Sequence, residues 1–152
     1  MVKDILNRKV FRLVSKNKGI SFSPDKSKVY TILRVKDYDE SGDWCRHYIL
    51  KDEDDQAIEV REFEAIFIPD TSLDEVDMVN KYLSDNDAYP SEIHRLDGKI
   101  YVLLEDSDWK HGHIWCDTLM RYLGYKKDNE VITEENGSDC YSSIHYFSKD
   151  AA

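Results

Sequence analysis

Hydrophobic and polar residues alternate over short stretches in the first half of the chain, which is the pattern of half-buried β-strands. The clearest stretch is residues 28–38, KVYTILRVKDY, where alternation places Val29, Thr31, Leu33 and Val35 on one face. Loops rich in Gly, Pro, Ser and Asp separate it from its neighbours. The other elements predicted in this half are strands over residues 8–15, 44–51 and 57–61, followed by a helical turn or a last strand over residues 62–70.

The second half combines the 3.6-residue period of amphipathic helices with two hairpin signals. An S-x-x-E capping box opens a helix predicted over residues 72–84. Asp97-Gly98 and Asn136-Gly137 each separate two stretches of alternating residues, as the turns of β-hairpins do. Between the hairpins, WKHGHIWCDTLMRYLGYKK (109–127) predicts a second helix. The predicted order is therefore helix, hairpin, helix, hairpin.

Two stretches of the first half resemble the small SH3-like or Tudor-like barrels of bacteria and phages. They are KVYTILRV (28–35), after a loop with Gly and Pro, and YILKDEDDQAIEVREFEAIFI (48–68), a hairpin followed by a short closing element. The resemblance covers residues 8–68 and implies a binding or scaffolding module, not a catalyst. The aromatic ligand cage of that family is not identifiable in this sequence.

These patterns together predict an α+β chain with two parts. Residues 1–69 are expected to form the small SH3-like β-barrel, and residues 70–152 the helix–hairpin–helix–hairpin α+β unit. The two parts could also pack as one domain, because 152 residues fit a single domain of ordinary size.

The composition predicts a folded, cytoplasmic protein. Hydrophobic residues make up 41% of the chain and aromatic residues 12%, whereas disordered chains are poor in both. No run of 18 apolar residues and no secretion leader occurs, which predicts no membrane association. The three cysteines are odd in number and form no CxxC motif, which favours free thiols in a reducing compartment over a disulfide framework.

The net charge of −10 is unevenly distributed along the chain. Residues 1–36 hold ten Lys/Arg and two Asp/Glu, residues 37–108 hold six and twenty-two, and residues 109–152 hold five and seven. The acidic middle disfavours binding to phosphate backbones and favours a basic protein partner, such as a nucleic-acid-binding enzyme. The alternative is that the charge serves solubility alone. Direct contact with nucleic acid is expected only through residues 3–36, where Lys3, Arg8, Lys9, Arg12, Lys16 and Lys18 would carry it.

Acidic residues concentrate on the strands and turns of the predicted barrel, interleaved with tyrosines. Carboxylates on a curved surface imitate the charge of a nucleic-acid backbone, as small phage-encoded inhibitors of nucleic-acid enzymes do. The sequence therefore predicts a non-enzymatic cytoplasmic interaction protein whose acidic face docks on a basic partner, with a phage-type inhibitor as one form. The predicted partner-binding residues are Asp37, Asp39, Glu40, Asp43, Asp52, Glu53, Asp54, Asp55, Glu59, Glu62 and Glu64.

The histidines and the cysteine of residues 109–127 raise the alternative of a ligand site. His113 and Cys116 are three residues apart, so both could act as metal ligands on one face of a helix. Further ligands from a distance could be Cys45, His47, Cys140 and His145. The same residues belong to a 4-3 spaced stripe typical of a core-facing helix, and no paired ligand motif occurs, so no metal is predicted. A phosphate-type anion at the helix start would instead use Lys110, His111 and His113.

The last predicted hairpin raises the alternative of an enzyme. Alternation places Ser143 and His145 on the same strand face, which suggests a nucleophile and its base. No GxSxG motif occurs and the sequence positions no acid partner. No catalytic residue and no cofactor are therefore predicted. A small-ligand or nucleotide-binding protein, or an enzyme, built on the helix start and this hairpin remains the alternative to the interaction protein.

Overall fold

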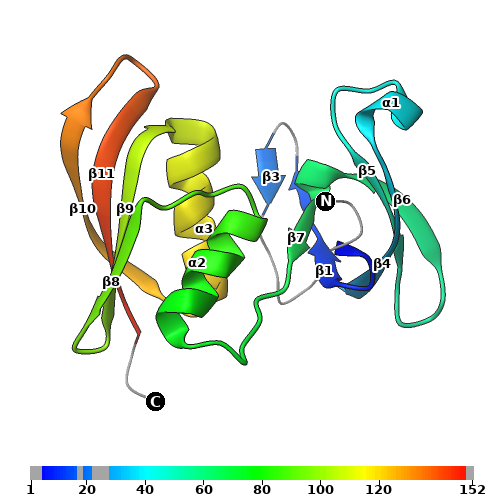
Figure 1. Cartoon of the computed structure of the whole chain (residues 1–152), viewed down its shortest axis with the longest axis horizontal. Coiled ribbons are helices and arrows are strands. Elements are labelled where there is room, and N and C mark those ends of the chain that lie inside the picture. Colours follow the sequence, from blue (N-terminus) through cyan, green and yellow to red (C-terminus); the bar gives the residue numbers. More distant parts are fainter. Residues whose placement is uncertain (1–4, 17–18, 22–27, 150–152) are drawn as a thin grey trace. The chain divides into compact units, whose positions relative to one another are not determined.

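A computed structural model describes residues 5–16, 19–21 and 28–149 of the chain. The chain divides into two compact units, Met1–Ile68 (unit 1) and Pro69–Ala152 (unit 2), which Figure 1 shows in blue to green and in green to red. The boundary predicted from the sequence fell one residue later, between residues 69 and 70. Each unit is built on its own antiparallel sheet.

Unit 1 is a five-stranded sheet in the order β6-β5-β4-β1-β7. A separate pair of short strands, β2 and β3, and two short helical segments lie in its connections. The elements are β1 (Lys9–Arg12), β2 (Val14–Lys16), β3 (Gly19–Ser21), β4 (Val29–Lys36), α1 (Tyr38–Ser41), β5 (His47–Lys51), β6 (Ala57–Arg61), a 3₁₀ turn (Glu62–Glu64) and β7 (Ala65–Phe67).

One face of this sheet carries the core of unit 1. Val10 of β1, Ile32 of β4, Leu50 of β5 and Val60 of β6 are all buried and belong to one hydrophobic cluster. Ile32 and Leu50 are direct cross-strand partners, so their side chains lie on the same face. Burial of large aliphatic side chains contributes roughly 1.5–3 kcal/mol each, which makes this cluster the main stabilising feature of the unit.

The barrel predicted for the first half is not closed. The edges of the sheet are β6 and β7, and among the described residues these two strands do not pair with each other. The 3₁₀ turn carries the chain from β6 across to β1, where the three residues of β7 pair with β1 at the far edge. Because β7 adds to the sheet beside β1 and not beside β6, the two edges stay unpaired with each other and the sheet stays open.

The face predicted for the clearest strand is also wrong. Leu33 was expected to share the core face with Val35, but 45% of Leu33 is exposed and Ile32 is buried. The register of β4 against β5 shifts between Ile32 and Arg34, which marks a β-bulge at this point. The extra residue inverts the alternation on one side of the bulge, so Ile32 and Val35 both face the core.

Unit 2 is a four-stranded sheet in the order β10-β11-β9-β8 with two helices on one face (Figure 1). The elements are α2 (Glu75–Asp85), β8 (Glu92–Leu96), β9 (Lys99–Asp108), a π-helical turn (Trp109–His113), α3 (Ile114–Tyr122), β10 (Lys126–Glu135) and β11 (Cys140–Ser148). The predicted order of helix, hairpin, helix and hairpin is confirmed. Positive φ angles at Asp97 and Gly98 show that the first hairpin has the two-residue turn expected, whereas the last hairpin turns over residues 136–139, where Gly137 has a positive φ and Asn136 does not.

The predicted capping box does not form at the start of α2. Asp70 accepts hydrogen bonds from the backbone N–H and the hydroxyl of Ser72, and the N-cap is Asp74. The helix therefore begins at Glu75, three residues later than predicted. Its buried face, which includes Val79 and Leu83, packs over the sheet.

The α+β class predicted for the chain is wrong. Antiparallel sheet dominates both units, and the α-helices of the described residues span only four, eleven and nine residues. Unit 2 is thus a sheet covered on one face by two short helices, not a helix-rich unit. None of the described helices has the length and apolar content needed to cross a bilayer.

Candidate functional site

The predicted acidic face of unit 1 is largely paired with basic residues of the same unit. The ion pairs are Arg46–Asp37 at 3.3 Å, Arg34–Glu40 at 2.9 Å, Arg61–Asp43 at 3.7 Å, Lys28–Asp52 at 3.5 Å, Lys28–Asp54 at 3.7 Å, Lys51–Asp55 at 2.8 Å and Lys36–Glu59 at 2.5 Å. Glu62 accepts from the Tyr38 hydroxyl at 3.3 Å, and Glu64 accepts from the backbone of Arg61. Residues 1–68 hold 13 Lys/Arg and 13 Asp/Glu, so the unit has no net charge.

One of these acids shapes a turn. The Asp52 carboxylate, nearly buried, accepts from the backbone N–H groups of Asp54 and Gln56 at 2.9 Å each. The hydrogen bond from Gln56 is the largest cause that holds the pKa of Asp52 below its ordinary value. Asp52 of the DEDDQ segment (52–56) therefore serves to form the β5–β6 turn.

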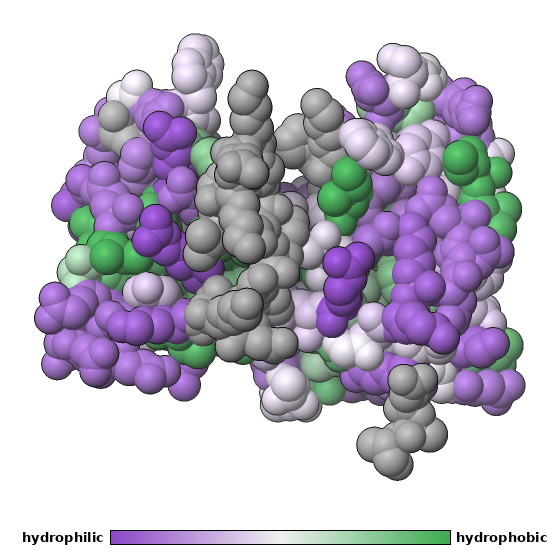
Figure 2. All heavy atoms as spheres, turned by 180° about the vertical axis from the view of Figure 1, so that it is seen from behind, coloured by the Kyte–Doolittle hydropathy of each residue, from purple (hydrophilic) through white to green (hydrophobic). Residues whose placement is uncertain are grey.

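Unit 2 holds the whole net charge of the protein. Residues 69–152 contain 8 Lys/Arg and 18 Asp/Glu. Exposed acids gather near the turn between β10 and β11, among them Glu105, Glu134, Glu135 and Asp139. Figure 2 shows hydrophilic side chains over most of the visible surface, interrupted by separate hydrophobic patches.

A polar network is buried between α3 and the sheet of unit 2. His113 Nδ1 lies 2.9 Å from His145 Nε2, and the Ser143 hydroxyl lies 2.8 Å from His145 Nε2 and 3.2 Å from His113 Nδ1. All three side chains are almost fully buried, and the His113 ring stacks on Tyr141 with 3.8 Å between centroids. Alternation correctly placed Ser143 and His145 on one face, but that face is interior and not exposed.

The contacts of the two rings indicate which nitrogens donate. His113 Nε2 faces the carbonyl oxygens of Ser107 and Tyr141, at 3.1 Å each, and therefore donates. His145 Nδ1 faces the Asp117 carboxylate at 2.8 Å and donates as well. The other nitrogen of each ring lies within 3.2 Å of the Ser143 hydroxyl, which can donate to either. Burial lowers the pKa of His113, which favours its neutral ring.

Two carboxylates and one ammonium complete the network toward solvent. Glu130 lies 3.4 Å from His145, and Lys127 contacts both Asp117 and Glu130 at 2.5 Å. Burial opposes the charge of Asp117, but the hydrogen bonds from His145 and Lys127 outweigh it and lower the pKa of this carboxyl. Lys127 therefore lies between the two carboxylates at the solvent side of the network.

Ser143, His145 and Asp117 have the connectivity of a hydrolase triad but lack its access. The order Ser–His–Asp and the contacts through Nε2 and Nδ1 match that mechanism. However, Ser143 and His145 expose no surface, so no substrate can reach the hydroxyl in this structure. The network links α3 to β10 and β11. The sequence did not predict its acid, Asp117, because the carboxylate reaches His145 only when α3 packs on the sheet.

Of the three side chains predicted to bind an anion, only that of His113 lies in the part of the chain that the structure describes. The side chains of Lys110 and His111 lie outside the part of the chain that the structure describes, and His113 faces inward. The group of Asp117, Glu130 and His145 has the donor atoms for a metal ion, but the ammonium of Lys127 already bridges both carboxylates. A second group with metal-binding donors, Asp43, Cys45 and His47, lies in unit 1.

The outer face of the sheet in unit 2 carries an aromatic hollow. Both helices cover the other face, whereas Tyr101 of β9 and Tyr146 of β11 point outward as cross-strand partners. Their ring centroids are 4.8 Å apart with an interplanar angle of 60°. Together with Asp128, Asn129, Val131 and Lys99 they line a hollow of about 270 Å³. The sequence predicted the strand positions of these tyrosines but not their pairing.

No protein-family model, no curated protein and no solved structure matches this chain. The resemblance of the first half to SH3-like barrels therefore gains no support from relatives. Function has to be argued from the chain's own geometry and charge.

Proposed function

We propose that this protein is a non-enzymatic, cytoplasmic interaction protein that binds a basic protein partner through the acidic unit 2. A cationic side chain of the partner enters the hollow that Tyr101 and Tyr146 line. The observation that carries the proposal is this pair of outward-facing rings on a unit with an excess of ten negative charges. A nucleic-acid-binding enzyme is the expected class of partner, since such proteins present Lys and Arg on their surfaces.

Two tyrosine rings inclined at 60° form a corner that suits a flat or compact cation. Cations within about 6 Å of an aromatic ring are attracted by roughly 0.5–2 kcal/mol, depending on how far they are removed from water. Asp128 supplies a carboxylate beside the rings, and Val131 supplies an apolar wall for the aliphatic stem of Lys or Arg. Asp128 lies 3.8 Å from the exposed Lys126, a contact too long to hold the carboxylate firmly.

Stacking tyrosines also suit the bases of single-stranded nucleic acid. The charge of unit 2 argues against that ligand, because phosphate binding needs an excess of Lys and Arg. Lys99 lines the same hollow and discriminates the two ligands. Removal of its charge should strengthen the binding of a cation and weaken the binding of a phosphate.

The cysteines support the cytoplasmic location that we propose. Cys45, Cys116 and Cys140 form no disulfide, and Cys116 is buried in the core of unit 2. Free thiols persist in reducing compartments, which supports the cytoplasm as the site of action.

The test is a titration of the whole protein with a fluorescently labelled arginine-rich peptide, followed by anisotropy. Tyr101→Ala and Tyr146→Ala should each weaken binding about 5- to 30-fold, the equivalent of about 1–2 kcal/mol of lost cation–π attraction. Tyr89→Ala is the matched control, since Tyr89 is an exposed tyrosine of the same unit away from the hollow. Lys99→Gln should tighten binding, and added salt should weaken it.

A matched glutamate-rich peptide and a single-stranded oligonucleotide complete the design. The proposal fails if either of them binds more tightly than the arginine-rich peptide. It also fails if the two hollow variants bind as well as the Tyr89→Ala control.

A further inference from the structure

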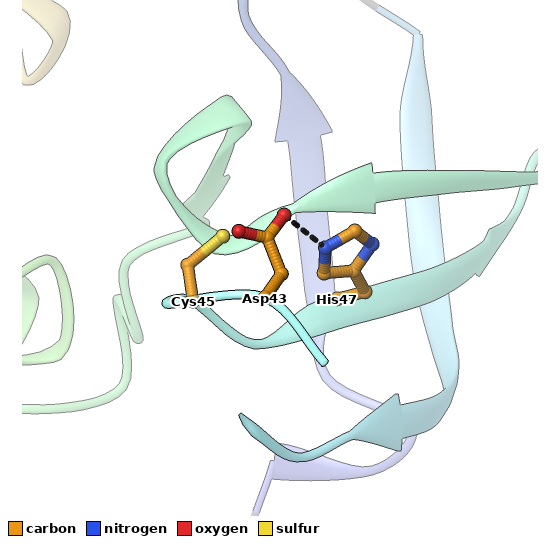
Figure 3. A group of neighbouring side chains, drawn as sticks. All are labelled: Asp43, Cys45 and His47. Atoms are coloured by element: carbon orange, nitrogen blue, oxygen red, sulfur yellow. Dashed lines mark hydrogen bonds and ion pairs between the residues drawn. The ribbon is translucent and has the colours of Figure 1, made fainter. Parts of the chain in front are cut away.

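We propose that Asp43, Cys45 and His47 of unit 1 form a binding site for a zinc ion. Each residue offers a donor of a different kind, a carboxylate oxygen, a thiol sulfur and an imidazole nitrogen, and these donor atoms all lie within 4.8 Å of one another. In Figure 3 the Asp43 carboxylate lies between the Cys45 sulfur and the His47 ring. This site is independent of the hollow in unit 2.

The local chain explains why three donors converge here. Gly42 ends α1 in the left-handed conformation, with φ of 66°, and residues 43–45 bend before β5 begins at His47. This bend brings the donor atoms of Asp43, Cys45 and His47 together. The D-x-C-x-H spacing thus presents all three donors from one segment of five residues, which keeps the entropic cost of assembling the site small.

Two carboxylates already orient the His47 ring. His47 Nε2 faces the Asp43 carboxylate at 3.2 Å, while Nδ1 lies 3.4 Å from Glu59 on the neighbouring strand β6. Glu59 is held in turn by Lys36 at 2.5 Å. With a metal on Nε2, the Nδ1–H donates to Glu59, which is the carboxylate–histidine–metal arrangement common to protein zinc sites.

The donor set selects the ion. A thiolate and an imidazole favour zinc over magnesium or calcium, which prefer oxygen ligands alone. Binding releases one proton from the Cys45 thiol, so thiolate and carboxylate together carry two negative charges that balance Zn²⁺. Without the ion, the Asp43 carboxylate lies 3.7 Å from Arg61, and bound zinc would replace Arg61 as its main positive partner. Three protein ligands leave the fourth position of the tetrahedron to water or another donor.

The test is a titration of the metal-free whole protein with Co²⁺, which replaces zinc and reports a cobalt–thiolate bond by its charge-transfer absorption. We expect one equivalent of Co²⁺ to produce the band and Zn²⁺ to remove it by displacement. Cys45→Ser should abolish the band, and His47→Gln should weaken metal binding. Cys140→Ser is the matched control, because Cys140 is also a half-buried free cysteine but lies in unit 2.

Glu59→Gln tests the positioning of the histidine. The loss of a carboxylate that accepts a hydrogen bond from a metal-binding histidine typically weakens metal binding about 10- to 100-fold. The absorption band itself should remain because all three donors are intact. Glu53→Gln, in the exposed β5–β6 turn, should change nothing.

The zinc site is refuted if the wild-type protein shows no thiolate band at excess Co²⁺. It is equally refuted if the band survives in Cys45→Ser or disappears in Cys140→Ser. Circular dichroism spectra that match the wild type exclude misfolding of a variant as the cause of a lost band.

Discussion

Replacement of Asp117 by asparagine should lower the free energy of unfolding of unit 2 by about 2–3 kcal/mol. The asparagine keeps the shape of the side chain but removes the negative charge that faces His145 at 2.8 Å and Lys127 at 2.5 Å. The buried His145 ring then loses a charged hydrogen-bond acceptor. Glu130 alone remains as a carboxylate partner of Lys127.

The magnitude follows from the burial of the partners. Loss of one member of a fully buried ion pair costs about 3–5 kcal/mol, and a hydrogen bond to a charged group contributes about 1.5–3 kcal/mol. His145 is fully buried, but the side chains of Asp117 and Lys127 are 21% and 31% exposed, so solvent screens part of the loss. Glu130 remains close to His145 and Lys127, which keeps the cost in unfolding free energy below the fully buried value.

Urea denaturation followed by tryptophan fluorescence can isolate unit 2. Trp109 and Trp115 lie in unit 2, and Trp44, the tryptophan of unit 1, is 97% exposed. A Trp44→Phe background should therefore cost little stability and leave fluorescence that reports on unit 2 alone.

The control is Glu92→Gln, which removes the charge of a carboxylate paired with His94 on the surface of the same unit. Exposed pairs contribute at most about 1 kcal/mol. If Asp117→Asn destabilises unit 2 no more than this control does, the buried network does not hold the charge distribution derived from its geometry.

Three further outcomes test other parts of unit 2. Burial lowers the pKa of His113, so the unfolded ring binds a proton first as the pH falls below about 6.5. The urea midpoint of unfolding should therefore drop between pH 7 and pH 5. His113→Gln should make the urea midpoint depend less on pH. Gly112→Ala should lower the melting temperature by an amount equivalent to about 1–3 kcal/mol, because its Cβ would lie 2.7 Å from the Ser107 Cβ. Burial raises the pKa of the Cys116 thiol, so a thiol reagent should label the other two cysteines in the folded protein and Cys116 only after unfolding.

Local signals were sufficient to predict the hairpins of unit 2 but not the strand faces of unit 1. The turn at Asp97-Gly98 depends on φ angles that few residue types adopt, so the sequence alone marks it, and Asn136-Gly137 marks the place of the longer last turn. The bulge at Leu33 depends on hydrogen bonds with β5, and no residue near it signals an extra position. Closure of the sheet likewise depends on where β7 pairs, which alternation does not specify.

The two candidate sites differ in the same way. The D-x-C-x-H spacing of Asp43, Cys45 and His47 lies within five residues and could have been identified from that spacing alone. It escaped because Cys45 and His47 were considered only as distant additions to a helix. The contacts of His113 with Ser143 and His145 join positions about 30 residues apart, and only the docking of α3 on the sheet creates them.

The charge pattern shows why a linear profile can misplace a binding surface. The basic segment and the first acidic segment look like two separate faces along the sequence, yet β4 places Arg34 and Lys36 beside Glu40 and Glu59. Unit 1 balances its own charges, and opposite charges on neighbouring strands favour the native register over shifted ones. Unit 2 has no such internal balance: its surplus of ten acids has no counterpart in its own sequence. A surface with that imbalance attracts a basic partner over a range set by the screening length, which is why the docking surface is expected on unit 2.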